Sequence, residues 1–126
     1  MLQFDEYKVK LNNLLPQLDE LEKALNLESA AREDFLEAQS ASDGFWDNPE
    51  NSQRVLQKLK QLKNKLESQE KRRASWEDMM VLCEMGNEEE DESLLPELEE
   101  EYNALIQSVE SAKLQTLLTG EYDASN

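Results

Sequence analysis

Apolar residues recur three and four positions apart along most of this chain. The first stripe begins at Phe4 and continues through six further apolar residues to Leu25. Such a stripe is typical of a helix that packs along its length on another helix. Pro16 lies inside the stripe without changing its phase, so we expect one helix over residues 3–26 that is kinked one turn before the proline.

A short second helix is expected after a break in the pattern at residues 26–29. It would cover residues 29–39 and, having few apolar residues, would need tertiary contacts to persist. Its inward face is predicted to consist of Ala31, Phe35 and Ala38.

A turn follows, marked by a glycine, two adjacent aromatic residues and a proline. Gly44 tolerates left-handed backbone angles, and Asn48 before Pro49 is typical of an N-cap followed by the first residue of a helix. Phe45 and Trp46 either plug the end of a helical bundle or form a ligand or partner site. The large apolar area of the two rings favours the plug.

A long third helix is expected over residues 49–85, about 55 Å in length at 1.5 Å per residue. Its apolar stripe is interrupted at Gln69 and Arg73, where the partner helix either ends or makes a polar contact. Gly86 and Asn87 are predicted to end the helix, because both residues tolerate the left-handed conformation. The stripe consists of Val55, Leu59, Leu62, Leu66, Trp76, Met80 and Cys83.

Five consecutive acidic residues, 88–92, are expected to form a solvated loop before a last helix over residues 93–118. Pro96 would lie in the first turn of this helix and Gly120 at its end. The fold class is therefore predicted to be all-α: an antiparallel bundle of three long helices plus a short helix, with coiled-coil-like packing. The last helix is expected to lie against the second half of the third helix, and the first helix and the short helix against its first half.

Charge is unevenly distributed on a chain whose formal net charge is −16. This net charge argues against nucleic-acid binding by the whole surface, but eight of the 13 basic residues lie between Arg54 and Arg73. Three of them, Lys58, Lys65 and Arg72, share one heptad position beside the apolar stripe. Pairing with acids on a neighbouring helix is the favoured interpretation, and contact with RNA phosphate or an acidic partner is the alternative. Replacing all three by glutamine would exclude the alternative if stability fell without loss of RNA affinity.

Catalytic and metal-binding chemistry is not expected in this chain. It contains no histidine and a single cysteine, Cys83, which lies on the apolar stripe and is predicted to be a buried apolar residue without a base to activate it. Carboxylates on solvated helix faces lack the dry surroundings that shift a catalytic pKa, and residues 47–53 lack the ligand spacing of an acidic metal loop. We therefore expect no catalytic residue, no metal and no cofactor. The chain has no apolar run long enough to span a bilayer and no signal core, so a cytoplasmic location is expected.

Three ordered motifs carry a family resemblance. They are Leu-Asn-Leu-Glu-Ser at residues 25–29, Gly-Phe-Trp-Asp-Asn-Pro-Glu at residues 44–50, and Leu-Leu-Thr-Gly-Glu-Tyr-Asp-Ala-Ser-Asn at residues 117–126. In order and spacing they resemble segments of bacterial peptide chain release factors, in the release factor 2 branch. The chain departs from the family pattern at Asp43 and Gly44, where Pro-Asp is frequent, and at Asn26, where Asp is frequent.

The resemblance implies a role in translation termination at UGA and UAA codons. The Ser-Pro-Phe element that reads the codon and the Gly-Gly-Gln loop that triggers peptidyl-tRNA hydrolysis are absent from this sequence. We therefore expect an isolated or truncated N-terminal domain over residues 1–120, and a tail over residues 121–126 that leads toward the absent codon-reading and catalytic core. By itself it would not be an enzyme.

The partners implied by the resemblance are the ribosome and the recycling GTPase release factor. The ribosomal contact would lie in the factor-binding region, at the stalk base around ribosomal protein L11, with ribosomal RNA nearby. A dimer of the isolated domain is also open, because truncation exposes apolar surface, and light scattering would decide it. The alternative is a free-standing coiled-coil adaptor. The gene sequence beyond Asn126 separates the two, since a downstream Gly-Gly-Gln reading frame supports only the first.

Overall fold

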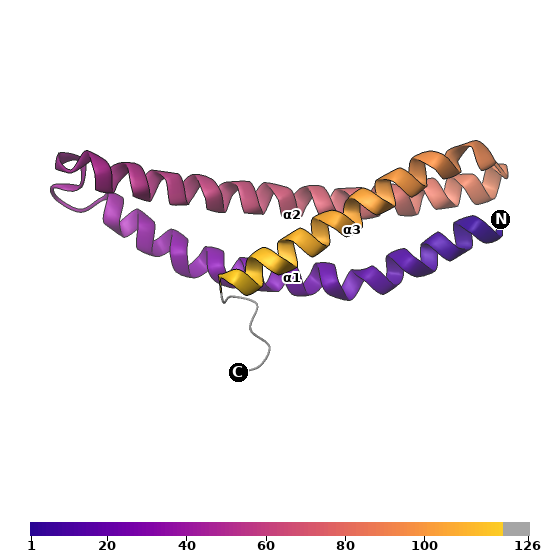
Figure 1. The fold of residues 1–126 in the computed structure, drawn as a ribbon, viewed down its shortest axis with the longest axis horizontal. Coiled ribbons are helices and arrows are strands. Elements are labelled where there is room, and N and C mark those ends of the chain that lie inside the picture. Colours follow the sequence, from indigo (N-terminus) through magenta and orange to yellow (C-terminus); the bar gives the residue numbers. More distant parts are fainter. Residues whose placement is uncertain (120–126) are drawn as a thin grey trace.

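Three long helices make up the computed structural model, which describes residues 1–119. They are α1 (Leu2–Ser40), α2 (Pro49–Glu89) and α3 (Leu95–Leu118), with short 3-10 helices η1 (Phe45–Asp47) and η2 (Glu92–Leu94) in the two connections. Figure 1 shows α1 and α2 running antiparallel and α3 crossing from the end of α2 to the middle of α1. The all-α prediction is confirmed, with no strand among the described residues. The predicted helix end at Gly120 and the tail lie outside them.

The predicted break at residues 26–29 is wrong, because α1 runs without interruption through Pro16 and through this segment. The segment contains neither glycine nor proline, and the modest helix propensities of asparagine and serine do not by themselves end a helix. Leu25 on one side and Leu36 on the other are both buried, so packing against α2 holds the helix together across the segment. The fourth, short helix of the prediction is thus the last part of α1.

The inward face of this last part also differs from the prediction. Phe35 is 62% exposed, whereas its neighbour Leu36 is 5% exposed and packs with Phe45 and Val55. A straight helix drifts away from a strict heptad, and the eleven residues from Leu25 to Leu36 correspond to three turns of about 3.67 residues. The buried face therefore moves by one position relative to the heptad that the first half of α1 follows.

The turn between α1 and α2 has the backbone that the sequence predicts. Gly44 has a φ of 78°, and the Asn48 side-chain oxygen accepts a hydrogen bond of 3.2 Å from the Asn51 N–H. The prediction that two rings plug the bundle is only half correct. Phe45 is 4% exposed, but Trp46 is 66% exposed and meets the Phe45 ring edge to face, with centroids 4.7 Å apart.

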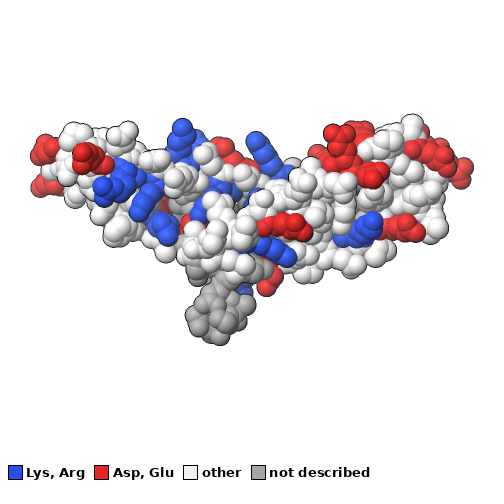
Figure 2. Space-filling view, in the orientation of Figure 1, with Lys and Arg blue, Asp and Glu red and all other residues white. Residues whose placement is uncertain are grey.

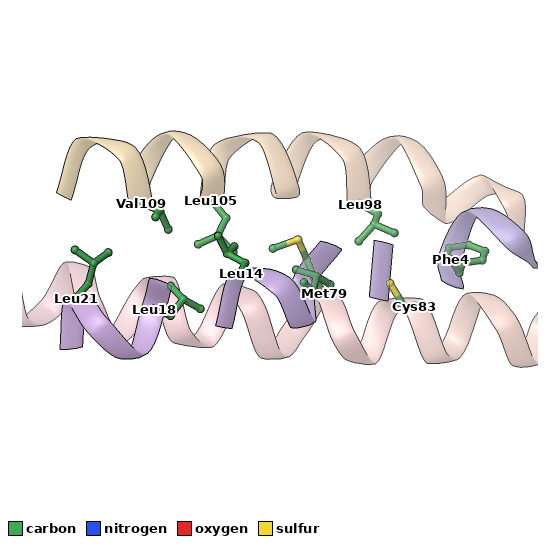
Figure 3. Packing of buried hydrophobic residues seen from close by; sticks show 10 residues of the cluster. Phe4, Leu14, Leu18, Leu21, Met79, Cys83, Leu98, Leu105 and Val109 are labelled. Carbon is green, nitrogen blue, oxygen red and sulfur yellow. The ribbon is translucent and has the colours of Figure 1, made fainter. Parts of the chain in front are cut away.

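The main core lies where all three helices run together (Figure 3). Residues from every helix are buried there, and on α1 they belong to the predicted stripe, namely Phe4, Leu11, Leu14, Leu18 and Leu21. On α2 the buried methionine is Met79 and not the predicted Met80, because Met79 faces both α1 and α3. The fully buried side chains are Phe4, Leu11, Met79, Cys83, Leu98 and Val109.

Gly86 does not end α2 as predicted, since the helix continues to Glu89 and the left-handed residue is Glu90, with a φ of 50°. Gly86 is buried under the Phe4 ring, and a Cβ atom built on Gly86 would overlap that ring. The neighbouring Asn87 donates to Asp5 at 3.0 Å, which ties the end of α2 to the start of α1. The glycine is therefore needed for a close helix–helix approach.

The polar interruption in α2 is a contact with α1 and not the end of the partner helix. The Arg73 guanidinium donates to the carboxylates of Asp19 and Glu22, both at 2.7 Å, and these hydrogen bonds raise the pKa of Arg73 above its usual value. One turn later, the Trp76 indole N–H donates to the Leu11 carbonyl at 2.6 Å. Helix α3 lies against the second half of α2, as predicted. Helix α1, however, pairs with both halves of α2 and not with the first half alone, so that part of the prediction is wrong.

Helices α1 and α3 meet through aromatic and polar contacts. The Tyr7 and Tyr102 rings pack edge to face at 5.6 Å, and the Lys10 ammonium lies 5.1 Å and 5.7 Å from their centroids. Farther along, the Lys113 ammonium donates to the Gln17 side chain. These contacts fix α3 against α1 on the side opposite to the Arg73 ion pairs.

Cys83 provides a probe of this core, because its side chain is fully buried. Burial raises the pKa of the thiol, with the nearby Asp5 and Glu84 carboxylates adding to this and Lys8 opposing it. We expect maleimide labelling of the folded protein to be at least about a hundred times slower than in urea, because it requires opening of the core. A raised folded-state pKa also means that stability is lost as the pH rises through that pKa. This loss of stability at high pH should be smaller in Cys83→Ala. Rapid maleimide labelling of the folded protein in buffer would contradict the burial of Cys83.

Candidate functional site

A groove of about 780 Å³ opens where α3 ends between α1 and α2. The helices face one another there through small and polar side chains, among them Ala24 on α1, Ser68 on α2 and Ser111 on α3. Few large apolar side chains fill the space between the helices at this level. The groove therefore separates the main core from the small cluster of Leu36, Phe45 and Val55 near the turn.

Positive charge gathers in this groove. Lys58, Lys65 and Arg72, which the sequence placed on one flank of α2, all line it. Arg32 of α1 joins them, and Glu28 is the single acidic residue of the lining, so the formal charge of the lining is +3. Figure 2 shows basic side chains mainly over the left-central part of this view, while acidic side chains occupy the left tip and crowd the upper right, at the connection between α2 and α3.

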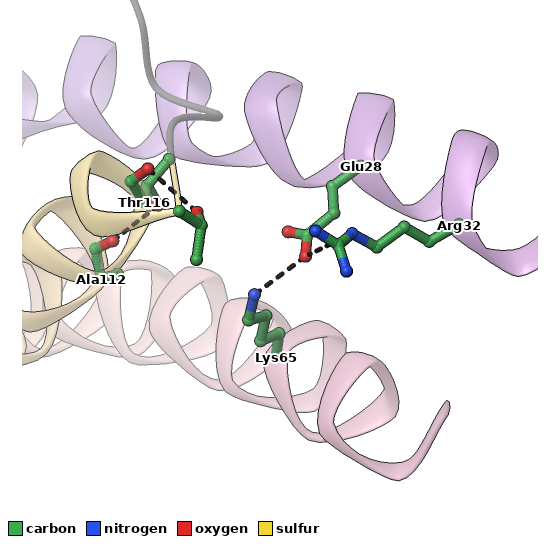
Figure 4. Close-up of polar contacts among 6 residues, drawn as sticks. Glu28, Arg32, Lys65, Ala112 and Thr116 are labelled. Carbon is green, nitrogen blue, oxygen red and sulfur yellow. Dashed lines mark hydrogen bonds and ion pairs between the residues drawn. The ribbon is translucent and has the colours of Figure 1, made fainter. Parts of the chain in front are cut away.

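Glu28 holds two of the cations by one carboxylate oxygen (Figure 4). The Lys65 ammonium lies 2.9 Å from Glu28 Oε1, and Arg32 Nε lies 3.7 Å from the same atom. The Glu28 side chain is only 9% exposed, whereas those of Lys65 and Arg32 are 25% and 48% exposed. Interhelical pairing, the favoured interpretation from the sequence, is therefore present for Lys65.

The other two predicted residues have different surroundings. Arg72 is half-buried and donates to the Ser108 hydroxyl at 3.5 Å, and burial lowers the pKa of its guanidinium. An arginine remains charged at neutral pH even so. Lys58 is exposed on the groove wall nearest the turn. Arg72 and Lys58 thus add charge to the groove, and over residues 1–119 neither has the interhelical ion pair seen for Lys65.

Uncharged polar groups complete the lining. The Thr116 hydroxyl donates to the Ala112 carbonyl at 2.7 Å, and the Thr119 hydroxyl donates to the Thr116 carbonyl at 3.0 Å (Figure 4). Both hydroxyl hydrogens are therefore bonded to backbone carbonyls at the end of α3. Serine and amide side chains on α2 and α3 provide further donors toward the groove. They are Gln61, Asn64, Ser68, Ser108, Ser111 and Gln115.

Titratable groups outside the groove are found on all three helices of the described chain. Over residues 1–119 no cluster of three histidine, cysteine or acidic side chains has the geometry to hold a metal ion. Burial raises the pKa of Glu101, whose carboxylate accepts a hydrogen bond of 3.3 Å from the Ser75 hydroxyl in a half-buried contact between α3 and α2. No described helix is long and apolar enough to cross a membrane. The basic groove is therefore the feature of the described chain with the clearest binding chemistry.

Comparisons with known proteins point to one family. The PCRF domain matches residues 29–126. The chain is 38% identical over 115 residues to peptide chain release factor 2 of Acidothermus cellulolyticus, a match that covers 90% of this chain and 31% of that protein. It is 32% identical over 127 residues to peptide chain release factor 2 of Clostridium perfringens, covering all of this chain and 35% of that protein. The chain thus spans about a third of the length of these relatives, and no solved structure matches it.

Proposed function

Because this chain belongs to the peptide chain release factor family, through a PCRF domain over residues 29–126, we propose that it serves as the ribosome-docking helical domain of a termination factor. The observation that carries the proposal is the extent of the similarity. Relatives named peptide chain release factor 2 align with 90–100% of this chain but with only about a third of their own length. The chain therefore corresponds to one part of a longer factor.

The division of labour within such a factor supports a docking role for this part. The Gly-Gly-Gln and Ser-Pro-Phe elements, through which the family triggers hydrolysis and reads UGA and UAA, do not occur in the sequence. The described residues instead form two long antiparallel helices of 39 and 41 residues, braced by a third. Such a rod suits positioning and contact, because the groove that its described helices form is open to solvent.

The proposed partners follow from the family. We place the docking contact in the factor-binding region of the ribosome, at the stalk base, and the recycling GTPase release factor is proposed as a second partner. Both partners imply that the protein works in the cytoplasm.

A free-standing coiled-coil adaptor is the second candidate function. The observation that favours it is the outer half of the α1–α2 hairpin, where only two helices pair and Phe35 and Trp46 are exposed. A gene that ends at Asn126 would favour the adaptor, and a reading frame that continues to Gly-Gly-Gln would favour the termination factor.

Ribosome co-sedimentation tests the proposed function. We expect the purified chain to pellet with vacant bacterial ribosomes at low salt, and added full-length release factor 2 to displace it, because both would occupy one site. The chain alone is not expected to release peptide from a termination complex. Failure to pellet at low salt, or pelleting that full-length factor does not compete, would contradict docking at the factor-binding region.

A further inference from the structure

We propose that the groove between α1, α2 and the end of α3 binds the phosphodiester backbone of RNA, and that Glu28 is its internal counter-ion. The inference rests on the proposed function in one respect, that ribosomal RNA is the polyanion a docking domain meets. It goes further by assigning the contact to particular residues. Lys58 and Arg72 are the principal phosphate contacts, and Glu28 limits the contribution of Lys65 and Arg32.

Charge complementarity selects a polyanion as the occupant of the groove. The groove lining carries a formal charge of +3 on a chain whose net charge is −16. Most of the surface therefore repels RNA, and the local field directs a phosphate chain toward this groove, whose lining is predominantly cationic. Release of counter-ions from the RNA then supplies the binding free energy.

The uncharged groups of the groove fit the same ligand. Lysine, arginine, serine, asparagine and glutamine side chains are those that contact phosphate and sugar oxygens. The groove offers all five kinds, with Ser108 already bonded to Arg72 and thereby orienting its guanidinium. No aromatic ring is found in the lining of this described groove. Base stacking is consequently absent, and the contact should be independent of RNA sequence.

In the absence of ligand, Glu28 partly neutralises the positive charge of the groove. Its nearly buried carboxylate lies within 2.9 Å of Lys65 and 3.7 Å of Arg32, so one negative charge is shared by two cations. Replacing it by glutamine keeps the shape and raises the formal charge of the lining by one. We therefore expect Glu28→Gln to bind RNA more tightly than the unchanged chain, by about threefold to tenfold.

The main test measures fluorescence anisotropy of a fluorescein-labelled oligouridine titrated with the chain. We expect the double variant Lys58→Gln/Arg72→Gln to bind at least about tenfold more weakly, with the salt slope reduced by about 0.7 per lost contact. Lys65 is left in place because its ion pair with Glu28 joins two helices. The matched control is Lys60→Gln/Lys71→Gln, which removes the same charge from exposed positions of α2 outside the groove. Its affinity should change by less than about twofold, because these exposed charges do not line the groove and are partly screened by salt.

The outcomes separate this inference from its alternatives. Equal weakening by both double variants, or unchanged or weaker RNA binding by Glu28→Gln with unchanged circular dichroism, would overturn it. Labelled poly-L-glutamate binding as tightly as oligouridine would assign the groove to an acidic protein partner instead. Ribosome co-sedimentation that survives Lys58→Gln/Arg72→Gln would overturn the groove assignment and leave docking intact. Failure of both the unchanged chain and the control variant to pellet would overturn docking itself.

Discussion

Replacing Phe4 by alanine is expected to lower the free energy of unfolding by about 3–5 kcal/mol, the usual cost of truncating a buried aromatic side chain. The Phe4 ring is fully buried and joins the start of α1 to the end of α2 and to α3. Its loss would leave a cavity against Gly86, whose backbone cannot fill the space. Urea unfolding followed by circular dichroism measures the effect.

Substitution of Gly86 tests the same contact from the side of α2. Glycine to alanine inside a helix ordinarily stabilises by about 1 kcal/mol. Gly86→Ala should instead destabilise by about 1–3 kcal/mol, because the new methyl group overlaps the buried Phe4 ring and forces it to move. In the Phe4→Ala background the same methyl group enters the vacated space. There Gly86→Ala should be neutral or stabilising.

A double-mutant cycle therefore isolates the contact between ring and backbone. The matched control is Ala74→Gly, at an exposed position on the same helix, which reports helix propensity without packing. A coupling of about 1–3 kcal/mol between Phe4 and Gly86 is expected, as for other residues in direct contact. Additive effects of the two substitutions would show that Gly86 is not needed for the close approach.

The sequence predicted most of the helical framework because the signals for it are local. Apolar spacing located the seam of α1 up to Leu25, and Gly44 with Asn48 and Pro49 located the turn and the start of α2. The errors occur where tertiary packing competes with a local signal. Gly86 looks like a C-cap, yet its spacing from the buried Met79 and Cys83 also fits the seam, where a small residue lets another helix approach.

The candidate site was predictable only in part. The shared flank of Lys58, Lys65 and Arg72 follows from their spacing on one helix, and the structure brings all three to one groove. Arg32 was missed because a break was expected just before it. A continuous α1 places Arg32 one turn after Glu28, and that i, i+4 pair is a signal that the sequence does contain. The closure of the groove by the end of α3 depends on how the helices cross, which no local pattern encodes.

After the replacement of Phe4, replacement of Trp76 is expected to lower the free energy of unfolding the most. It is half-buried against the core, and its indole N–H donates to the Leu11 carbonyl at 2.6 Å. Leu11 lies next to the turn of α1 that lacks one backbone hydrogen bond, because Pro16 has no N–H to donate. We expect Trp76→Ala to lower the free energy of unfolding by about 3 kcal/mol.

Two further variants separate the hydrogen bond of Trp76 from its packing. Trp76→Phe keeps most of the apolar area but leaves the Leu11 carbonyl without the indole donor, so a loss of about 1 kcal/mol is expected. Trp46→Phe is the control, because the exposed Trp46 ring should tolerate the same change within about 0.5 kcal/mol. If Trp76→Phe proved as mild as Trp46→Phe, the indole bond would not contribute to holding α1 and α2 together. A clear difference would show that α2 supports α1 at the place where the proline weakens it.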